Sequence, residues 1–326
     1  MTDIKTVLCP LDFSILSERE LRLAAQVCER FGARMVVQHN IDFVPPIYLA
    51  NAWMYSESHM YPEEERELEA GRRIKEVLER QPASVRAEGR ITFGNLEECI
   101  LNLAYQLPAD LILMGTHGPT SAQHVSHTDR VLTQSLCPVL TLRDSRSGDL
   151  CFPNLAAIDT AELQPALLPM DFSSHSLRAL EYALSLMDHI PMKLHLLHVE
   201  ANLAMDDLRA LTHRLHFEEE KRRRLNASLK RLEAALPARY SNQVVCEARM
   251  GSVVEQVITY AQSIQCKLIF MGAHTKNVLD RVIFGANSQG VLHQSPCPVW
   301  LIPEARPEPH SWIVPAGAHR VIESRS

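Results

Sequence analysis

The strongest constraint on the fold is an internal repeat with a period of about half the chain. Val7–Ser14 returns as Ala166–Ser173, with an aspartate, a phenylalanine and a serine at matching places. Further along, the Met-Gly-x-His sequence at Met114–His117 returns at Met271–His274, and a Cys-Pro-Val run then closes each half. A chain of 326 residues also exceeds the usual single domain, which is about 100–200 residues long. The repeat therefore predicts two copies of one domain.

The two copies differ in length at one place. Equivalent residues are 157 positions apart at His117 and His274, but 160 positions apart at Cys137 and Cys297. The second copy therefore has three more residues than the first between these two pairs. Any function carried by this segment is expected to differ between the halves.

Within each half, short apolar runs alternate with segments of helical periodicity. Thr6–Leu11 is an apolar run, Ser17–Phe31 has helical spacing, and Arg34–His39 is strand-like again. Ser17 and Glu20 match a capping box, which predicts that the first helix starts at Ser17. Strands that are apolar throughout and alternate with helices are typical of a parallel sheet covered on both faces. We therefore predict an α/β fold in each half.

The segment between the halves has little periodicity and is predicted to be a linker. We place a first domain at residues 1–146, the linker at 147–163, and a second domain at 164–303. The remaining residues, 304–326, contain three prolines and form a C-terminal tail. We expect this tail to be flexible or to lie on the body of the protein.

Composition excludes several classes of protein. The net charge is −6 and aromatic residues make up 6%, so a general nucleic-acid-binding surface is not expected. No apolar stretch reaches the roughly 18–20 residues of a membrane helix, and the first residues lack the pattern of a signal peptide. The eight cysteines form no C-x-x-C pair and are expected to be free thiols. We expect a cytoplasmic protein.

Together these motifs resemble the universal stress protein family, in a tandem form with two domains in one chain. The resemblance rests on Pro-x-Asp-Phe-Ser, Met-Gly-x-His and the closing Cys-Pro-Val, and it covers Thr6 to Pro303. It implies a five-stranded parallel sheet of strand order 3-2-1-4-5 in each half. It also implies that fifth strands pair, within one chain or between the chains of a homodimer. We expect Pro138–Leu142 and Pro298–Ile302 to pair internally, because a tether raises their effective concentration.

In members of the family that bind ATP, the sequence G-x2-G-x9-G-[ST] follows the fourth strand and wraps the phosphates. The second half matches its spacing, with Gly272 and Gly285 at the first and third glycine positions. Thr275 replaces the second glycine and Ala286 replaces the Ser/Thr, while Asn287 follows as a polar residue. Thr275 is the more serious departure, because its β-carbon hinders close approach of a phosphate or a left-handed backbone. The resemblance implies an ATP site that includes these five residues.

The first half keeps a different part of the same motif. Gly115 and Gly118 hold the first two glycine positions, but the shorter loop that follows has no Gly-Ser sequence. Asp12 and its equivalent Asp171 stand where the family places a carboxylate near the nucleoside. The structural alternative is that each aspartate makes a turn before the first helix. The resemblance thus adds Asp171 to the second-half site and implies a weaker first-half site of Asp12, Gly115 and Gly118.

Histidines provide two further candidates. His39 and His198 end the second strand of each half, where we expect packed, hydrogen-bonded rings rather than ligands. His117, His124 and His127 lie close together in the shortened loop. Zinc accepts such side chains, but this spacing matches no established zinc site. We therefore predict no metal.

Two functions remain open on the sequence. The first is a stress protein whose second half binds ATP or a related adenine nucleotide, which changes its contacts with protein partners. The alternative is a scaffold of the same fold that binds no nucleotide and in which the glycines only build turns. The sequence contains no G-x-S-x-G, no P-loop Gly-Lys-Ser/Thr and no HExxH. We predict a binding protein rather than an enzyme, although slow ATP hydrolysis could accompany binding.

Overall fold

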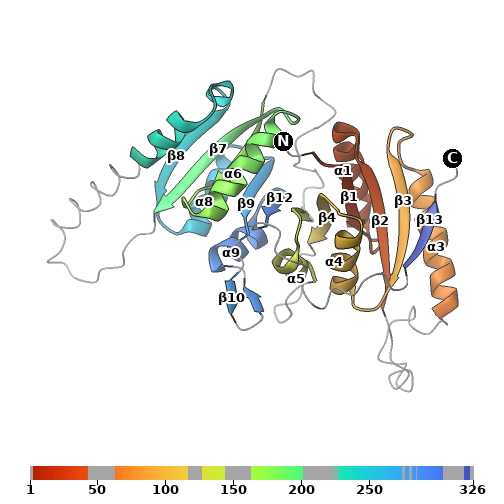
Figure 1. Ribbon diagram of the computed structural model, residues 1–326. Coiled ribbons are helices and arrows are strands. Elements are labelled where there is room, and N and C mark those ends of the chain that lie inside the picture. Colours follow the sequence, from red (N-terminus) through yellow and green to blue (C-terminus); the bar gives the residue numbers. More distant parts are fainter. Residues whose placement is uncertain are drawn as a thin grey trace. The chain divides into compact units, whose positions relative to one another are not determined.

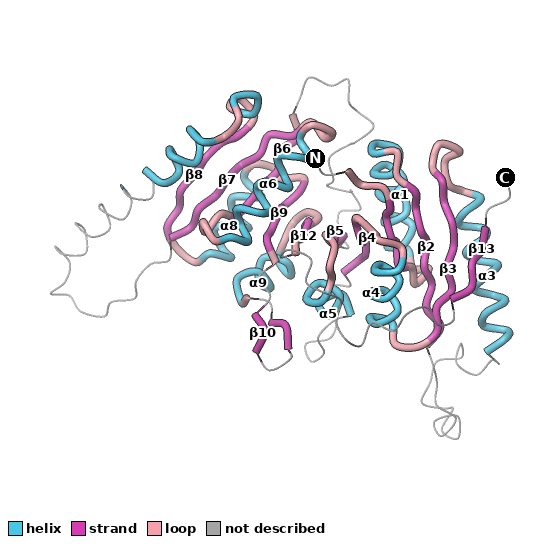
Figure 2. The backbone as a smooth tube through the Cα atoms, in the orientation of Figure 1, coloured by secondary structure: helices cyan, strands magenta, loops and turns pink. Residues whose placement is uncertain are grey.

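The chain forms two compact units, each built around one half of the repeat (Figures 1 and 2). Unit 1 comprises Met1–Gly148, Thr275–Ile283 and Pro303–Ser326, and unit 2 comprises Asp149–His274 and Phe284–Ile302. The computed structural model describes residues 3–42, 63–116, 127–143, 163–200, 223, 227–273, 276–278, 281–283, 285–303 and 319–323.

Unit 1 contains five parallel strands in the order β3-β2-β1-β4-β5, which is the order that the resemblance implies. One cavity is lined by both α1 and α3, which therefore share a face of the sheet, while α4 and α5 contact each other. The elements are β1 (Thr6–Pro10), α1 (Ile15–Phe31), β2 (Arg34–Ile41), α3 (Glu63–Glu79), β3 (Arg86–Phe93), α4 (Leu96–Gln106), β4 (Leu111–Thr116), α5 (His127–Gln134) and β5 (Val139–Arg143).

A sixth strand that the sequence analysis missed joins the outer edge of this sheet. β13 (His319–Glu323) runs antiparallel to β3, with Val321 opposite Arg90. The sheet of unit 1 is therefore mixed rather than purely parallel, and part of the tail at 304–326 forms a strand. An edge strand has unpaired backbone groups on one side, so even a short segment with two β-branched residues finds partners there.

Unit 2 repeats the same order as β8-β7-β6-β9-β12, again with parallel neighbours. Its elements are β6 (Gln164–Pro169), α6 (Ser174–Met187), β7 (Met192–Glu200), a 3-10 helix (Ala238–Tyr240), β8 (Val244–Met250), α8 (Val253–Ser263), β9 (Leu268–Gly272), α9 (Ala286–Gln294) and β12 (Val299–Ile302). Between β9 and α9, an antiparallel hairpin of β10 (Lys276–Val278) and β11 (Arg281–Ile283) belongs to unit 1.

Apolar side chains of the strands fill the core of each unit, as the continuous apolar runs predict. In unit 2, Trp300 and Phe270 are fully buried and stack with ring centroids 5.9 Å apart. The seven cysteines within the described ranges are free thiols, as expected. Across the same ranges, no helix has both the length and the apolar character needed to cross a bilayer.

The first helix does not start where the capping box predicts. α1 begins at Ile15, and its N-cap is Ser14, whose hydroxyl oxygen accepts a hydrogen bond from the Ser17 N–H at 3.4 Å. The Ser17 hydroxyl donates instead to Asp12 Oδ1 at 2.6 Å. The helix starts earlier because the Ser14 hydroxyl caps the Ser17 N–H in the first turn, while Asp12 engages the Ser17 hydroxyl. Glu20 therefore lies inside the helix, where it is buried.

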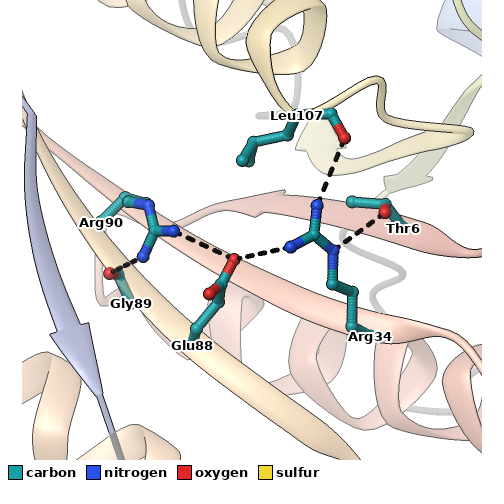
Figure 3. Close-up of polar contacts among 6 residues, drawn as sticks. All are labelled: Thr6, Arg34, Glu88, Gly89, Arg90 and Leu107. Carbon is teal, nitrogen blue, oxygen red and sulfur yellow. Dashed lines mark hydrogen bonds and ion pairs between the residues drawn. The ribbon is translucent and has the colours of Figure 1, made fainter.

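A polar network ties the amino ends of the first three strands of unit 1 together (Figure 3). Arg34 on β2 donates to the Thr6 hydroxyl at 3.0 Å and to the Leu107 carbonyl at 3.4 Å. The same guanidinium pairs with Glu88 at 3.4 Å, and Arg90 meets that carboxylate at 3.2 Å. Since ligands of open α/β sheets bind at the carboxyl ends of strands, this network has a structural role.

Candidate ligand site

The carboxyl ends of β6 and β9 line a cavity of about 410 Å³ in unit 2. These strands are neighbours, but the chain continues from β6 to β7 on one side and from β9 to β12 on the other. The strand order therefore reverses between β6 and β9, and ligands of such sheets bind at this switch point. The volume lies within the usual range of small-molecule sites, about 300–1,000 Å³. Five of the six residues predicted for this half line the cavity, namely Asp171, Gly272, Gly285, Ala286 and Asn287. The sixth, Thr275, lies outside the described residues.

Most of the cavity wall is apolar, and a few polar groups line the rest. The polar side chains that line it, besides those predicted, belong to Ser173, His175, Ser176 and Ser288. Such a combination of apolar wall and few oriented polar groups is typical of sites for organic ligands. The apolar lining comes from the strand ends and from helices α8 and α9, through Met170, Leu197, Val199, Val253, Val257, Met271 and Val291.

Asp171 makes the turn that the structural alternative predicts. Its Oδ1 accepts hydrogen bonds from the Ser173 N–H at 3.0 Å and from the Ser173 hydroxyl at 2.6 Å. Partial burial raises the pKa of Asp171, but the hydrogen bonds from Ser173 and Ser176 outweigh it and the pKa lies below its usual value. The carboxylate is therefore ionised at neutral pH, and it remains exposed at the edge of the cavity.

The residue after each aspartate has a strained backbone. Phe13 and Phe172 have φ angles of 59° and 60°, a left-handed conformation that is uncommon for a bulky residue. Each phenylalanine ring lies against a histidine ring, with centroids 4.5 Å apart for His39 and 5.2 Å apart for His198. Nδ1 of each histidine is hydrogen bonded to a carbonyl oxygen just after the first strand, at 2.8 Å and 2.6 Å respectively. The expectation of packed, hydrogen-bonded histidines is confirmed.

The two glycines of the second half have different physical roles. A β-carbon added at Gly272 would overlap the backbone carbonyl of His175, so glycine lets α6 pack directly on the end of β9. Gly285 is the N-cap of α9, with a φ of −60°, and a β-carbon there would meet no atom within 4 Å. Gly285 is therefore not required by backbone conformation or packing, and it leaves open space at the start of a helix.

The start of α9 can receive an anion. The first N–H groups of a helix have no partner within the helix, and Gly285 has no side chain to cap them. Ala286, Asn287 and Ser288 form this first turn and line the cavity. Backbone donors and the positive end of the helix dipole together favour phosphate or carboxylate groups.

In unit 1, the glycine equivalent to Gly272 is covered by a side chain. Glu20 is only 4% exposed, and its carboxyl group accepts a hydrogen bond from the Gly115 N–H. A β-carbon added at Gly115 would overlap Glu20 Oε1. Burial first, and then the charge of Asp12, raise the pKa of Glu20 to about 8, against the opposing effect of the Gly115 hydrogen bond. Glu20 is therefore mostly protonated at neutral pH.

Of the three residues predicted for the first half, the structure describes Asp12 and Gly115. Asp12 lines a cavity of about 560 Å³ with His39 and with Arg66 and Arg73 of α3, and Gly115 is not among the described residues of its lining. Gly118, His117 and His124 lie outside the described residues. Within the described ranges, no group of three or more side chains is arranged to hold a metal ion.

Sequence analysis did not assign Ser173, His175 or Glu20 to these sites. Ser173 belongs to the repeated Pro-x-Asp-Phe-Ser motif, so a closer look at that motif could have found it. His175 acts through its backbone carbonyl, which leaves no signal in the sequence. Glu20 could have been found by aligning the two halves, because its equivalent in the second half is Ala179.

Comparison with known proteins agrees with the family resemblance that the sequence motifs indicate. The model of the universal stress protein family matches residues 3–143 and again residues 162–303. The "Universal stress protein in QAH/OAS sulfhydrylase 3′region" of Thermus aquaticus is 29% identical over 142 residues, which cover 43% of this chain and 98% of that protein.

Solved structures resemble nearly the whole chain. A universal stress protein from Archaeoglobus fulgidus DSM 4304 has a TM-score of 0.63 at 20% identity and covers 92% of this chain and 96% of its own. A protein of unknown function from Pseudomonas aeruginosa PAO1 has a TM-score of 0.59 at 13% identity, over 93% and 94% of the two chains. At these identities the likeness shows the fold alone.

Proposed function

Because the chain belongs to the universal stress protein family, we propose that unit 2 binds ATP or a related adenine nucleotide and that the bound nucleotide changes the protein's contacts with partners. One observation carries the proposal. Residues from three separate places in the sequence, represented by Asp171, Gly272 and Gly285, line one cavity of about 410 Å³ at the switch point of the sheet. The glycines belong to the nucleotide-binding motif, and Asp171 is the carboxylate that the family resemblance adds to it.

The chemistry of the cavity suits the two ends of a nucleotide. The phosphates would lie at the first turn of α9, where Gly285 leaves room and the backbone N–H groups of Ala286 and Asn287 are donors. The base and ribose would lie against the apolar wall, with the ionised Asp171 near the ribose hydroxyls. A carboxylate accepts hydrogen bonds from hydroxyl groups, so this orientation also keeps Asp171 away from the phosphate charges.

The bound nucleotide is a signal rather than a substrate in this proposal. Among the described residues that line the cavity, Asp171 is the one carboxylate and His175 the one imidazole. Asp171 already accepts two hydrogen bonds from Ser173, which hold it in the turn. A general base must be free to reach the attacking water, so we expect at most slow hydrolysis.

The alternative is a scaffold of the same fold without a nucleotide. It is supported by two contacts that explain motif residues without any ligand. Gly272 is needed because α6 packs against it, and Asp171 is needed because it makes the turn before α6. Gly285 is the residue on which the two proposals differ, because neither packing nor backbone conformation requires glycine there.

Mass spectrometry of the small molecules released by heat denaturation tests the proposal most simply. The purified full chain should release an adenine nucleotide, or should bind added ATP in an isothermal titration after the released fraction has been removed. Protein that contains no nucleotide and gives no heat with ATP at millimolar concentration would favour the scaffold. GTP serves as the control ligand, because it has the same phosphates but a different base.

A further inference from the structure

The two halves carry different residues at one buried position of the first helix. The offset of 159 that relates Asp12 to Asp171 also relates Glu20 on α1 to Ala179 on α6. Both positions are buried, with Glu20 at 4% and Ala179 at 0% exposure. A glutamate is almost never buried unless its carboxyl group has a partner. The partner of Glu20 therefore tells what this position does.

That partner is Gly115, the glycine of the fourth strand of unit 1, which is equivalent to Gly272 in unit 2. The Glu20 carboxyl accepts the Gly115 N–H, and Oε1 lies so close to Gly115 that any β-carbon would overlap it. Thr128, at the start of α5, donates to the carbonyl of the same glycine at 3.0 Å. Both backbone groups of Gly115 are thus engaged by side chains of the same unit.

The direction of the glycine N–H is the same in both units. In β9, the Ala273 N–H bonds to the Ile302 carbonyl on the β12 side at 2.8 Å. Successive N–H groups of a strand point to opposite sides, so the Gly272 N–H points toward β6 and the crevice between them. In β4, the Ile112 N–H bonds on the β5 side at 3.0 Å. By the same alternation, the Gly115 N–H points toward β1, where Glu20 meets it.

We propose that Glu20 determines which half of the chain accepts an anionic ligand. From within unit 1, its carboxyl group fills the space beside the strand-four glycine and takes the N–H donor that faces the crevice. In unit 2, Ala179 has no carboxyl group to occupy the N–H of Gly272, and Gly272 borders the cavity. Asp12 adds a second acidic side chain near Glu20, which disfavours a phosphate further. The inference rests on the proposed function only for what the open half binds.

The test is to give unit 1 the residue that unit 2 has. Glu20→Ala removes both the filling group and the acceptor, and unit 2 shows that this fold packs with alanine at the position. Glu20→Gln is the matched control, because its amide oxygen still accepts the Gly115 N–H and its side chain has the same size. In Glu20→Gln the side chain should still cover Gly115 and accept its N–H, whereas in Glu20→Ala both the cover and the hydrogen bond should be lost.

Selective labelling reads the two sites separately. The chain has 12 glycines, so an amide spectrum of the full chain labelled with ¹⁵N-glycine is simple enough to follow Gly115 and Gly272 individually. Inorganic phosphate is the probe for unit 1. We expect Glu20→Ala to bind it about tenfold more tightly at Gly115 than wild type or Glu20→Gln does. Unshifted signals of the other glycines check that the fold is retained.

Two results would overturn the inference: a Gly115 signal in Glu20→Ala that does not respond to phosphate, or one that responds equally in all three proteins. ATP is added to wild type in a separate titration. If ATP fails to shift Gly272 while phosphate shifts Gly115 in Glu20→Ala, the proposed nucleotide function is wrong and the inference about Glu20 stands. If ATP shifts the Gly272 signal in wild type but phosphate does not shift the Gly115 signal in Glu20→Ala, the inference about Glu20 is wrong and the proposed nucleotide function stands.

Discussion

In both units, the region at the carboxyl ends of the first and fourth strands has the same backbone features, but the side chains beside the fourth strand differ. Each has an aspartate that makes a turn, a phenylalanine in a left-handed conformation, a hydrogen-bonded histidine and a glycine at the end of the fourth strand. In unit 2 the glycine borders a cavity of about 410 Å³. In unit 1 the glycine is covered by the carboxyl group of Glu20.

This difference separates residues that build the fold from residues that decide on a ligand. Asp12 and Asp171 make the same turn in both units, and Gly115 and Gly272 both allow the first helix to approach the fourth strand. These motif residues therefore do not distinguish a half that binds from a half that does not. The distinguishing residues are Gly285 and the helix position of Glu20.

The largest effect is expected from crowding the strand-four glycine of unit 2. In Gly272→Ala the added β-carbon meets the His175 backbone, which cannot rotate away, so unfolding should cost about 3 kcal/mol less than in wild type. In Gly115→Ala the nearest atoms belong to the side chains of Glu20 and Leu16, which can move, and the loss should be about 1 kcal/mol. Urea unfolding followed by circular dichroism measures both. Equal losses in the two variants would contradict the packing difference.

Separation of the halves tests why they are joined. We expect fragments cut within 147–163 to dimerise or aggregate, because the tether keeps the fifth strands at an effective concentration on the order of millimolar. A fragment 1–146 also lacks β13 and leaves the edge of β3 unpaired. Light scattering at micromolar concentration measures the state of each fragment. Two well-behaved monomers would show that neither strand pairing is needed.

Gly285 should matter for the ligand and little for the fold. Gly285→Val adds a β-carbon that meets no protein atom within 4 Å, and its side chain enters the space proposed for the phosphates, so it should abolish ATP binding to unit 2. A valine is a poorer N-cap than glycine, at a cost of about 1 kcal/mol to the helix. The matched control is Gln289→Val, on the exposed surface of the same helix and outside the cavity. Titration calorimetry with ATP compares them, and loss of binding in both variants would point to helix damage instead.

The smallest effect concerns the pH dependence of unit 1. Burial raises the pKa of Glu20 from 4.5 to about 8, so between these values the folded protein holds a proton that the unfolded chain has released. Stability from this group is fully present below pH 4.5 and falls toward pH 8, by up to about 1.4 kcal/mol per pH unit. Glu20→Gln cannot titrate and should lose this slope. Urea unfolding from pH 5 to 8 measures the difference between the two curves, and parallel curves would mean that Glu20 is ionised in the folded protein.

The fold was predictable because the same pattern of strands, helices and turn motifs occurs in both halves of the sequence. Repeated apolar runs and turn motifs indicated both sheets, and the family resemblance supplied the strand order that the structure confirms. β13 was missed, since its five residues follow a proline-containing stretch and carry no periodicity of their own. The start of α1 was misplaced because Ser14 and Ser17 are both acceptable N-caps, and the contact of Ser17 with Asp12 decides between them.

The site was predictable only in its motif residues. Motif spacing located Gly272 and Gly285. It could not show that close packing requires glycine at position 272 but not at position 285. That distinction depends on how closely α6 approaches β9, a property of tertiary structure. The role of Glu20 likewise depends on a contact between residues almost a hundred positions apart in the chain. Sequence patterns of a single segment do not contain such contacts.

The stoichiometry of ATP binding tests the contrast between the units most directly. Isothermal titration of the full chain should give one site per chain, because Gly272 and Gly285 border an open cavity while Glu20 covers Gly115. The same titration of Gly285→Val should give no site. Two equivalent sites in wild type, or one site that survives Gly285→Val, would show that the two units do not differ in the way described.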